Sequence, residues 1–261
     1  MPQEPRRAKA TADRFRGRPV RVRREGRRQG GGSRAFSLVE LLVTLAVLSV
    51  LAALLLPALG RAKAQARRVD CLNRLRQMGL AWMIHLDDHE NRFPDRRDLK
   101  TGLPGGWKPW TDWPRSDPRS GWAAVVLSNQ LPPGPLWLCP AWFRSPQRRH
   151  PASAQPLAGG PEAPLIGYWM WRFDRPDDPI PLDNFWGKTP EGAVADLRRA
   201  DNPFISRPAG PVEVELVVDS YFPATVSSLP DEVRGAALHR GGRNRLFLDG
   251  HAAFERDARL K

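Results

Sequence analysis

Three side chains near the C-terminus are of types that bind metal ions. They are His239, Asp249 and His251, and Asp219 is a fourth candidate upstream. Imidazole and carboxylate together suit a transition-metal ion, whereas calcium would require more oxygen ligands. The interpretation we favour is structural: Asp249-Gly250 forms a turn and His239 hydrogen-bonds a neighbouring loop. No cofactor is therefore expected, and a metal site at His239, Asp249 and His251 is the alternative.

The chain has only two cysteines, Cys71 and Cys139. Two isolated cysteines without a CxxC pair cannot form a structural zinc site unaided. A disulfide is chemically permitted outside the cytoplasm. We predict a disulfide between Cys71 and Cys139, with two free buried thiols as the alternative.

The sequence contains no recognisable catalytic motif. GxSxG and HExxH are both absent, and no Ser or Cys nucleophile occurs in a familiar setting. The glycines of "QGGGS" (29–33) lie in a basic tract and do not open a phosphate-binding helix. A catalytic His–Asp pair near the C-terminus is therefore disfavoured, and the protein is not expected to be an enzyme.

Six tryptophans fall between residues 107 and 142. Exposed tryptophans with interleaved Arg and Asp could stack on sugar rings or nucleobases. We favour the interpretation that these rings close a small head that lacks a large aliphatic core.

An apolar run from Phe36 to Leu56 carries a single charge, Glu40. A helix of this length spans a hydrocarbon core of about 30 Å. The run is therefore predicted to be a transmembrane helix. A charged side chain in lipid is costly and usually has a partner. Glu40 is expected either to pair with a positive group or to reach the membrane interface.

The first 35 residues hold most of the excess positive charge. The formal net charge is +13, of which residues 1–35 contribute +9 and the other 226 residues +4. This Pro/Gly/Arg-rich tract is too poor in apolar residues to form a core, so we expect it to be disordered. Positive flanks stay in the cytoplasm, which places the N-terminus inside and the head outside. Nucleic-acid binding by the tract is the less favoured reading.

The helical pattern continues beyond the membrane segment. Apolar residues recur at steps of three and four, which indicates one buried helix face: Val69, Leu72, Leu75, Gly79, Trp82, Met83 and Leu86. Pro57 is expected to kink the helix without ending it. The stop signals of "HENRFPD" end it near residue 90, so residues 36–94 form the helical domain and 95–261 the head.

The head is predicted to combine few regular elements with long loops. We expect a helical turn in "WAAVVLSN" (122–129), a strand in "PLIGYWMW" (164–171), a strand in "VEVELVVDS" (212–220) and a flexible segment over 145–164. The segment "RLFLDGHAAFE" (245–255) is typical of a β-hairpin with a type I′ turn at Asp249-Gly250.

The stretch "AFSLVELL" (35–42) resembles the leader of type IV pilins and type II secretion pseudopilins. The resemblance implies cleavage between Ala35 and Phe36 by a prepilin peptidase and methylation of the new amine of Phe36. Glu40 then takes the position of the family's assembly carboxylate, which pairs with the amine of a neighbouring subunit, and Pro57 is also a family position. Ala35 departs from the family's preferred Gly, so slower processing is expected.

Two further blocks resemble pseudopilin-like proteins of planctomycete and verrucomicrobial bacteria. They are "CLNRLRQMGLAWMIHLDDHENRFPD" (71–95) and a C-terminal His-x9-Asp-Gly element formed by His239, Asp249 and Gly250. The role of the histidine in that element does not follow from its residues.

These observations predict an α+β, pilin-like fold in which a long N-terminal helix packs on a small antiparallel sheet. The resemblance implies a structural subunit of a type II secretion pseudopilus or a type IV pilus-like fibre. It would lie in the bacterial inner membrane, with its head in the periplasm or on the cell surface. Its partners would be a prepilin peptidase, other pilin-like subunits and membrane lipid, and no nucleic acid. The alternative is a membrane-anchored glycan- or metal-binding protein that does not polymerise.

Overall fold

The computed structural model describes residues 36–106, 114, 116–173, 184–200 and 207–261. The chain divides into two compact units, one ending at Ala52 and one running from Ala53 to Lys261. The basic leader predicted over 1–35, including Ala35 at the expected cleavage site, lies outside the described residues. The fold is α+β, with a long N-terminal apolar helix and a small antiparallel sheet, as predicted.

Helix α1 (Leu38–Asp88) is 51 residues long and confirms the helix predicted over about 36–90. It passes through Pro57, and a kink there stays a prediction. The helix ends where Glu90 and Asn91 adopt left-handed backbone angles and the Asn91 amide donates to the Leu86 carbonyl at 2.8 Å. Such a reversal is a common way to satisfy the last carbonyls of a helix.

The large side chains of the apolar run at the start of α1 are exposed. Every large apolar side chain between Phe36 and Leu56 is at least 50% exposed. In the described parts of the chain, α1 is the one helix that is long and apolar enough to cross a membrane. This apolar helix near the N-terminus is consistent with a single-pass membrane anchor.

The second part of α1 buries a narrow stripe against the head. The buried side chains step by four and three residues along one face: Cys71, Leu75, Met78, Trp82 and His85. The prediction was right for Leu75, Gly79, Trp82 and Leu86 but wrong for Val69, which is 45% exposed. A 3.6-residue period fits two adjacent stripes almost equally well, and packing on the head selects the one that contains Cys71.

Gly79 lets α1 approach the sheet closely. A Cβ at Gly79 would lie 2.8 Å from Leu246 Cδ1 and 2.9 Å from the Gly250 carbonyl oxygen. The helix backbone therefore packs directly on the hairpin of β5 (Gly242–Phe247) and β6 (Ala252–Arg256), which no larger residue would allow without movement.

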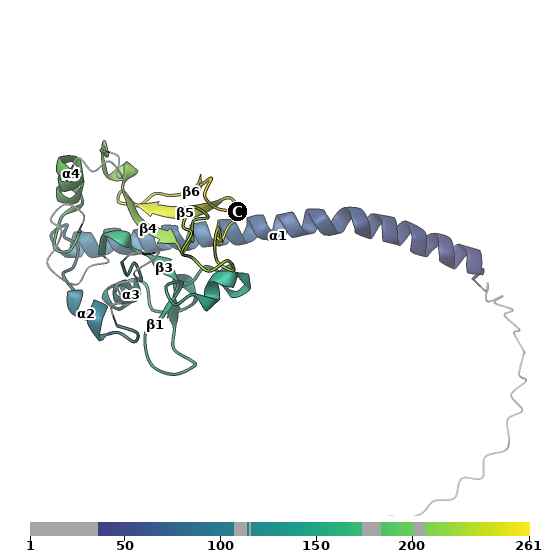
Figure 1. The fold of residues 1–261 in the computed structure, drawn as a ribbon, viewed down its shortest axis with the longest axis horizontal. Coiled ribbons are helices and arrows are strands. Elements are labelled where there is room, and N and C mark those ends of the chain that lie inside the picture. Colours follow the sequence, from purple (N-terminus) through teal and green to yellow (C-terminus); the bar gives the residue numbers. More distant parts are fainter. Residues whose placement is uncertain (1–35, 107–113, 115, 174–183, 201–206) are drawn as a thin grey trace, which may run out of the picture. The chain divides into compact units, whose positions relative to one another are not determined.

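The head is built on a four-stranded antiparallel sheet of order β3-β4-β5-β6 (Figure 1). Its strands are β3 (Tyr168–Trp169), β4 (Glu215–Asp219), β5 (Gly242–Phe247) and β6 (Ala252–Arg256). A separate two-stranded ribbon joins β1 (Gln155–Pro156) to β2 (Leu165–Ile166). The expected strand over 164–171 is thus divided between β2 and β3, and the expected strand over 212–220 is shortened to β4.

Short helices connect these strands. The α-helices are α2 (Arg97–Gly102), α3 (Gly121–Val126) and α4 (Pro190–Ala200), and α3 confirms the helical turn predicted at 122–129. The 3-10 turns are η1 (Pro135–Trp137), η2 (Trp142–Arg144), η3 (Pro146–Arg149), η4 (Trp171–Phe173) and η5 (Pro211–Glu213).

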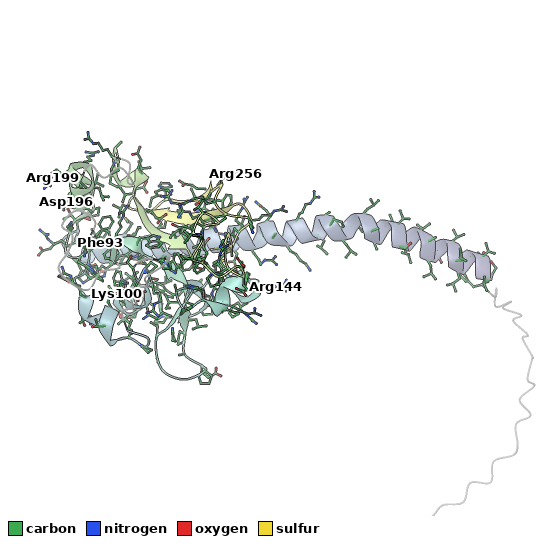
Figure 2. The ribbon with its side chains drawn as sticks, viewed as in Figure 1. Phe93, Lys100, Arg144, Asp196, Arg199 and Arg256 are labelled. Atoms are coloured by element: carbon green, nitrogen blue, oxygen red, sulfur yellow. The ribbon has the colours of Figure 1, made fainter. Side chains whose placement is uncertain are left out.

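Aromatic rings fill the larger of two cores. Trp82 on α1 contacts Phe93, Trp122 and Phe173, with ring centroids 5.5–6.2 Å apart. Trp122 and Trp137 are fully buried, so these two rings are core residues as predicted. Trp107, Trp110 and Trp113 lie outside the described residues. In Figure 2, Phe93 lies inside the head, whereas Arg199 and Arg256 point away from it.

Strand β4 separates the two cores. Leu216 and Val217 join the aromatic core, whereas Val218 packs in a smaller cluster with Trp169, Tyr221, Phe222, Leu229, Val233 and Leu260. Asp219, the last residue of β4, is only 1% exposed.

Two local predictions were wrong. The hairpin at 245–255 forms, but its turn runs over Phe247–Gly250 and only Gly250 has a positive φ, of 86°. A type I′ turn needs a positive φ at both central residues, so Asp249-Gly250 does not form one. The segment 145–164 is not a free excursion over its first part, where Gln147, Ala152, Ser153 and Gln155 are buried and β1 pairs with β2, whereas residues 158–162 are exposed.

Candidate functional site: the start of α1 and a buried cluster

Ser37 and Glu40 bond reciprocally at the start of α1. The Ser37 amide donates to Glu40 Oε2 at 2.9 Å, and the Glu40 amide donates to Ser37 Oγ at 3.1 Å. This is a capping box, which satisfies two amides that the first helical turn leaves without partners. Glu40 thus has a local role that the sequence prediction missed, although the S-x-x-E spacing was visible.

The carboxylate of Glu40 is also exposed on an apolar helix surface. Glu40 is the single charged residue between Phe36 and Leu56, and its nearest described neighbours are exposed as well. Phe36, the expected first residue after cleavage, is 73% exposed. The carboxylate is therefore free to meet a positive group of another molecule, at the cost of its bond to Ser37.

A second site lies inside the head, where four side chains from distant parts of the chain converge. They are Cys71, Cys139, Asp219 and His239, which we call the buried cluster. Cys71 comes from the buried stripe of α1, and Cys139 follows the 3-10 turn η1. Asp219 ends β4, and His239 lies in the loop before β5, where it forms a β-bridge with Gly242.

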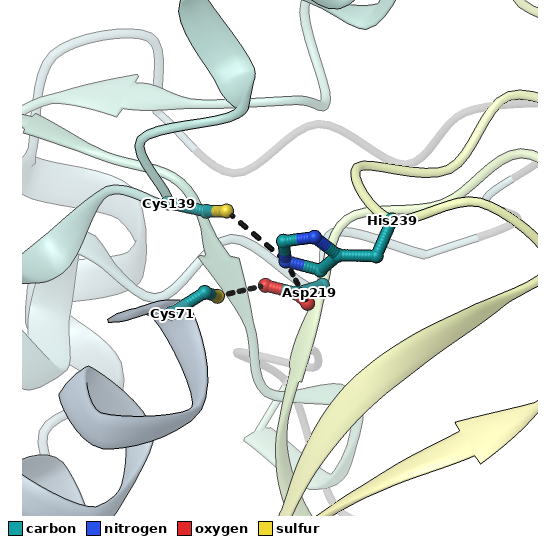
Figure 3. A group of neighbouring side chains, drawn as sticks. All are labelled: Cys71, Cys139, Asp219 and His239. Carbon is teal, nitrogen blue, oxygen red and sulfur yellow. Dashed lines mark hydrogen bonds and ion pairs between the residues drawn. The ribbon is translucent and has the colours of Figure 1, made fainter. Parts of the chain in front are cut away.

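The donor atoms of the buried cluster all lie within 4.8 Å of one another (Figure 3). Cys71 Sγ donates to Asp219 Oδ1 at 3.0 Å. His239 Nε2 lies 3.4 Å from Cys139 Sγ and 3.4 Å from Asp219 Oδ2. All four side chains therefore point toward one small volume.

Burial strongly affects the proton affinities of these groups. It raises the pKa of Cys71 well above its usual range, and the hydrogen bond with Cys139 adds to the effect. Burial likewise raises the pKa of Asp219 against the opposing charge of His239. Burial alone would lower the pKa of His239, but the hydrogen bond with Cys139 and the charge of Asp219 raise it on balance. The pKa of Cys139 is lowered despite burial, because Cys71 and His239 hydrogen-bond its sulfur.

Neighbouring groups hold the cluster in place. Asp219 Oδ2 accepts from the Asn244 amide at 3.0 Å, and Tyr168 Oη lies 3.4 Å from Cys71 Sγ. Asn244 and Tyr168 are both fully buried. These contacts fix the orientation of the carboxylate and of one sulfur.

The structure changes the set of candidate metal ligands. His239, Asp249 and His251 do not form one group; His239 faces Asp219, which the sequence offered only as a fourth candidate. Asp249 and His251 are exposed at the hairpin turn, and His251 Nδ1 lies 2.6 Å from Asp249 Oδ1. The residues of the His-x9-Asp-Gly element therefore lie in two different sites: Gly250 is part of the hairpin turn, and His239 is part of the buried cluster.

The two cysteines are free in the structure, so the predicted disulfide is not formed there. The structure matches the alternative of two free, buried thiols, and both cysteines belong to the buried cluster. Sequence reasoning paired the cysteines with each other because it could not see that Asp219 and His239 reach the same point.

Comparison with known proteins identifies the N-terminal segment. Residues 31–56 match the family model of the prokaryotic N-terminal methylation motif, a range that includes Ala35, Phe36 and Glu40. Together with the apolar helix and the antiparallel sheet, this match supports a prepilin-like protein. No curated protein and no solved structure matches the chain significantly.

Proposed function

We propose that the chain is the precursor of a structural, pilin-like subunit. A prepilin peptidase cuts between Ala35 and Phe36 and methylates the new amine of Phe36. The mature chain then assembles with other pilin-like subunits into a type II secretion pseudopilus or a type IV pilus-like fibre. Its head lies in the periplasm or on the cell surface, and it works as a building element without an enzymatic reaction of its own.

Glu40 is the observation that carries the proposal. It is the one charge in the exposed apolar run of residues 36–56, and it lies within the matched methylation motif. An uncompensated charge in a low-dielectric environment costs several kcal/mol, whereas a pair with an opposite charge recovers much of that cost. The amine freed at Phe36 of an adjacent subunit supplies such a partner close to the same depth in the membrane.

The nature of the head supports a structural role over glycan binding. Trp122 and Trp137, two of the rings that could have stacked on a sugar, are fully buried in the core. The alternative, a membrane-anchored binding protein that never polymerises, predicts an uncleaved chain that keeps residues 1–35.

The test is the intact mass and N-terminal residue of the chain recovered from membranes of cells with and without a working prepilin peptidase. We expect an N-methylated Phe36 as residue one when the peptidase is present, and the full leader when it is absent. An Ala35→Gly variant should be processed at least as completely as the native chain. Recovery of the unprocessed chain from cells with active peptidase, for both sequences, would overturn the proposal.

A further inference from the structure

We propose that the buried cluster of Cys71, Cys139, Asp219 and His239 is a structural zinc site. The site would join α1 to the head at one point. This inference goes beyond the proposed function and does not depend on cleavage or polymerisation.

The types and number of donors suit zinc. Structural zinc sites take four ligands in tetrahedral geometry, chiefly thiolate and imidazole, with carboxylate as a third type. The cluster offers two sulfurs, one imidazole nitrogen and one carboxylate oxygen. Thiolates favour zinc over magnesium or calcium, which prefer oxygen ligands. The nitrogen that faces the other donors is His239 Nε2, which is therefore the coordinating atom.

The geometry requires only small shifts. Bond lengths of zinc to sulfur, nitrogen and oxygen give separations of about 3.4–3.8 Å between ligand atoms in a tetrahedral site. The cluster has separations of 3.0, 3.4 and 3.4 Å between hydrogen-bonded donors, and none exceeds 4.8 Å. All these separations therefore lie within about 1 Å of the tetrahedral range.

A bound cation would also compensate a buried negative charge. Asp219 is only 1% exposed, and its carboxylate lies 3.0 Å from Cys71 Sγ in an interior where an unpaired charge is costly. When Zn²⁺ binds, the two thiol protons pass to solvent and the thiolates and carboxylate coordinate the cation. A disulfide would use the two sulfurs alone and would leave the convergence of Asp219 and His239 on the same point unexplained.

The surroundings already resemble a second coordination shell. The Asn244 amide holds Asp219 Oδ2, and Tyr168 Oη is placed to donate to Cys71 Sγ. Such outer partners orient the ligands, and their loss typically weakens metal binding by 10–100-fold. Because all four ligands are 5% exposed or less, the site is closed to substrate, which is typical of structural zinc.

The experiment measures metal in the full-length chain, purified in detergent without chelators. Elemental analysis is expected to give about one zinc per chain, and a denaturing thiol assay two free thiols. Zinc should fall to background in Cys139→Ser and His239→Ala variants and remain at one in His251→Ala, the matched control outside the cluster. Tyr168→Phe should weaken zinc binding about tenfold.

Cobalt substitution of the native chain provides a readout that does not depend on variants folding. Exchange of zinc for Co²⁺ should give a near-ultraviolet thiolate-to-metal band and the strong visible bands of tetrahedral cobalt. Three results would overturn the proposal: a chain that takes up neither zinc nor cobalt, a native mass that shows a Cys71–Cys139 disulfide, or zinc content unchanged in Cys139→Ser and His239→Ala. If those variants do not fold, the cobalt spectrum of the native chain determines whether the proposal holds.

Discussion

Ser37 and Glu40 cap the start of α1 by exchanging two backbone-to-side-chain hydrogen bonds. The proposed intermolecular pair with Phe36 would use the same carboxylate. Glu40 therefore has two possible roles, one within its own helix and one between subunits, and two substitutions can separate them.

Glu40→Gln should abolish assembly while the helix start stays intact. Glutamine can replace glutamate in a capping box, so the bond to the Ser37 amide is kept, but the negative charge is lost. We expect normal insertion and cleavage and no sheared or cross-linkable fibre. Ser37→Ala is the matched variant: it removes one capping bond, at a cost of about 1 kcal/mol, but keeps the charge and should still assemble. Fibres of normal yield from Glu40→Gln would refute the charge-pair mechanism.

Gly79→Ala should destabilise the head. The added methyl group would meet the Gly250 carbonyl at 2.9 Å and Leu246 at 2.8 Å, which forces α1 away from the hairpin. We expect a loss of about 1–3 kcal/mol in the free energy of unfolding, measured by thermal unfolding of the chain in detergent. Gly60→Ala is the control, because nothing lies within 4 Å of that position. It should be neutral or stabilising by up to about 1 kcal/mol, and equal effects at the two sites would contradict the close approach.

Acid should destabilise the head through His85. Burial, helped by the charge of His89, lowers the pKa of His85 from 6.5 to about 4, and among the described residues its Nε2 has no hydrogen-bond partner. Between pH 6.5 and 4 the unfolded chain therefore binds a proton that the folded chain does not. The contribution of neutral His85 to the free energy of unfolding is complete above pH 6.5. It is lost as the pH falls toward 4, by up to about 3 kcal/mol. His85→Leu should flatten the pH dependence of unfolding in this interval; an unchanged slope would contradict the assignment.

Asp117→Asn should cost far more stability than Asp98→Asn. Asp117 accepts two bonds from Arg119 at 2.8 Å, and both side chains are 5% exposed or less. Removing one charge of a buried pair typically costs about 3–5 kcal/mol. Asp98 pairs with Arg96 at 2.9 Å on the surface, where solvent screens the charges and such pairs contribute little to stability. Denaturant titrations of the two variants compare them directly, and similar midpoints would show that the buried pair is not structurally important.

The sequence predicted the secondary structure correctly where local patterns determine it. The apolar run and the periodic face predict α1 to within two residues at each end, because a continuous helix is determined by neighbours one turn apart. The hairpin at 245–255 follows from alternation and from Gly250. The same reasoning failed at Val69 and at the type of the hairpin turn. At both places the local sequence is compatible with more than one conformation or buried face, and packing between α1 and the sheet determines which one forms.

By itself, the sequence determined the long apolar helix, its single acid at Glu40, the methylation motif and the α+β class, because each is expressed in consecutive residues. The convergence of Cys71, Cys139, Asp219 and His239 was decided only in the tertiary structure. Their separations along the chain, from 20 to 168 residues, carry no spacing signal. Sheet pairing and helix packing place the four side chains at one point, and this placement turns four unremarkable residues into a candidate metal centre.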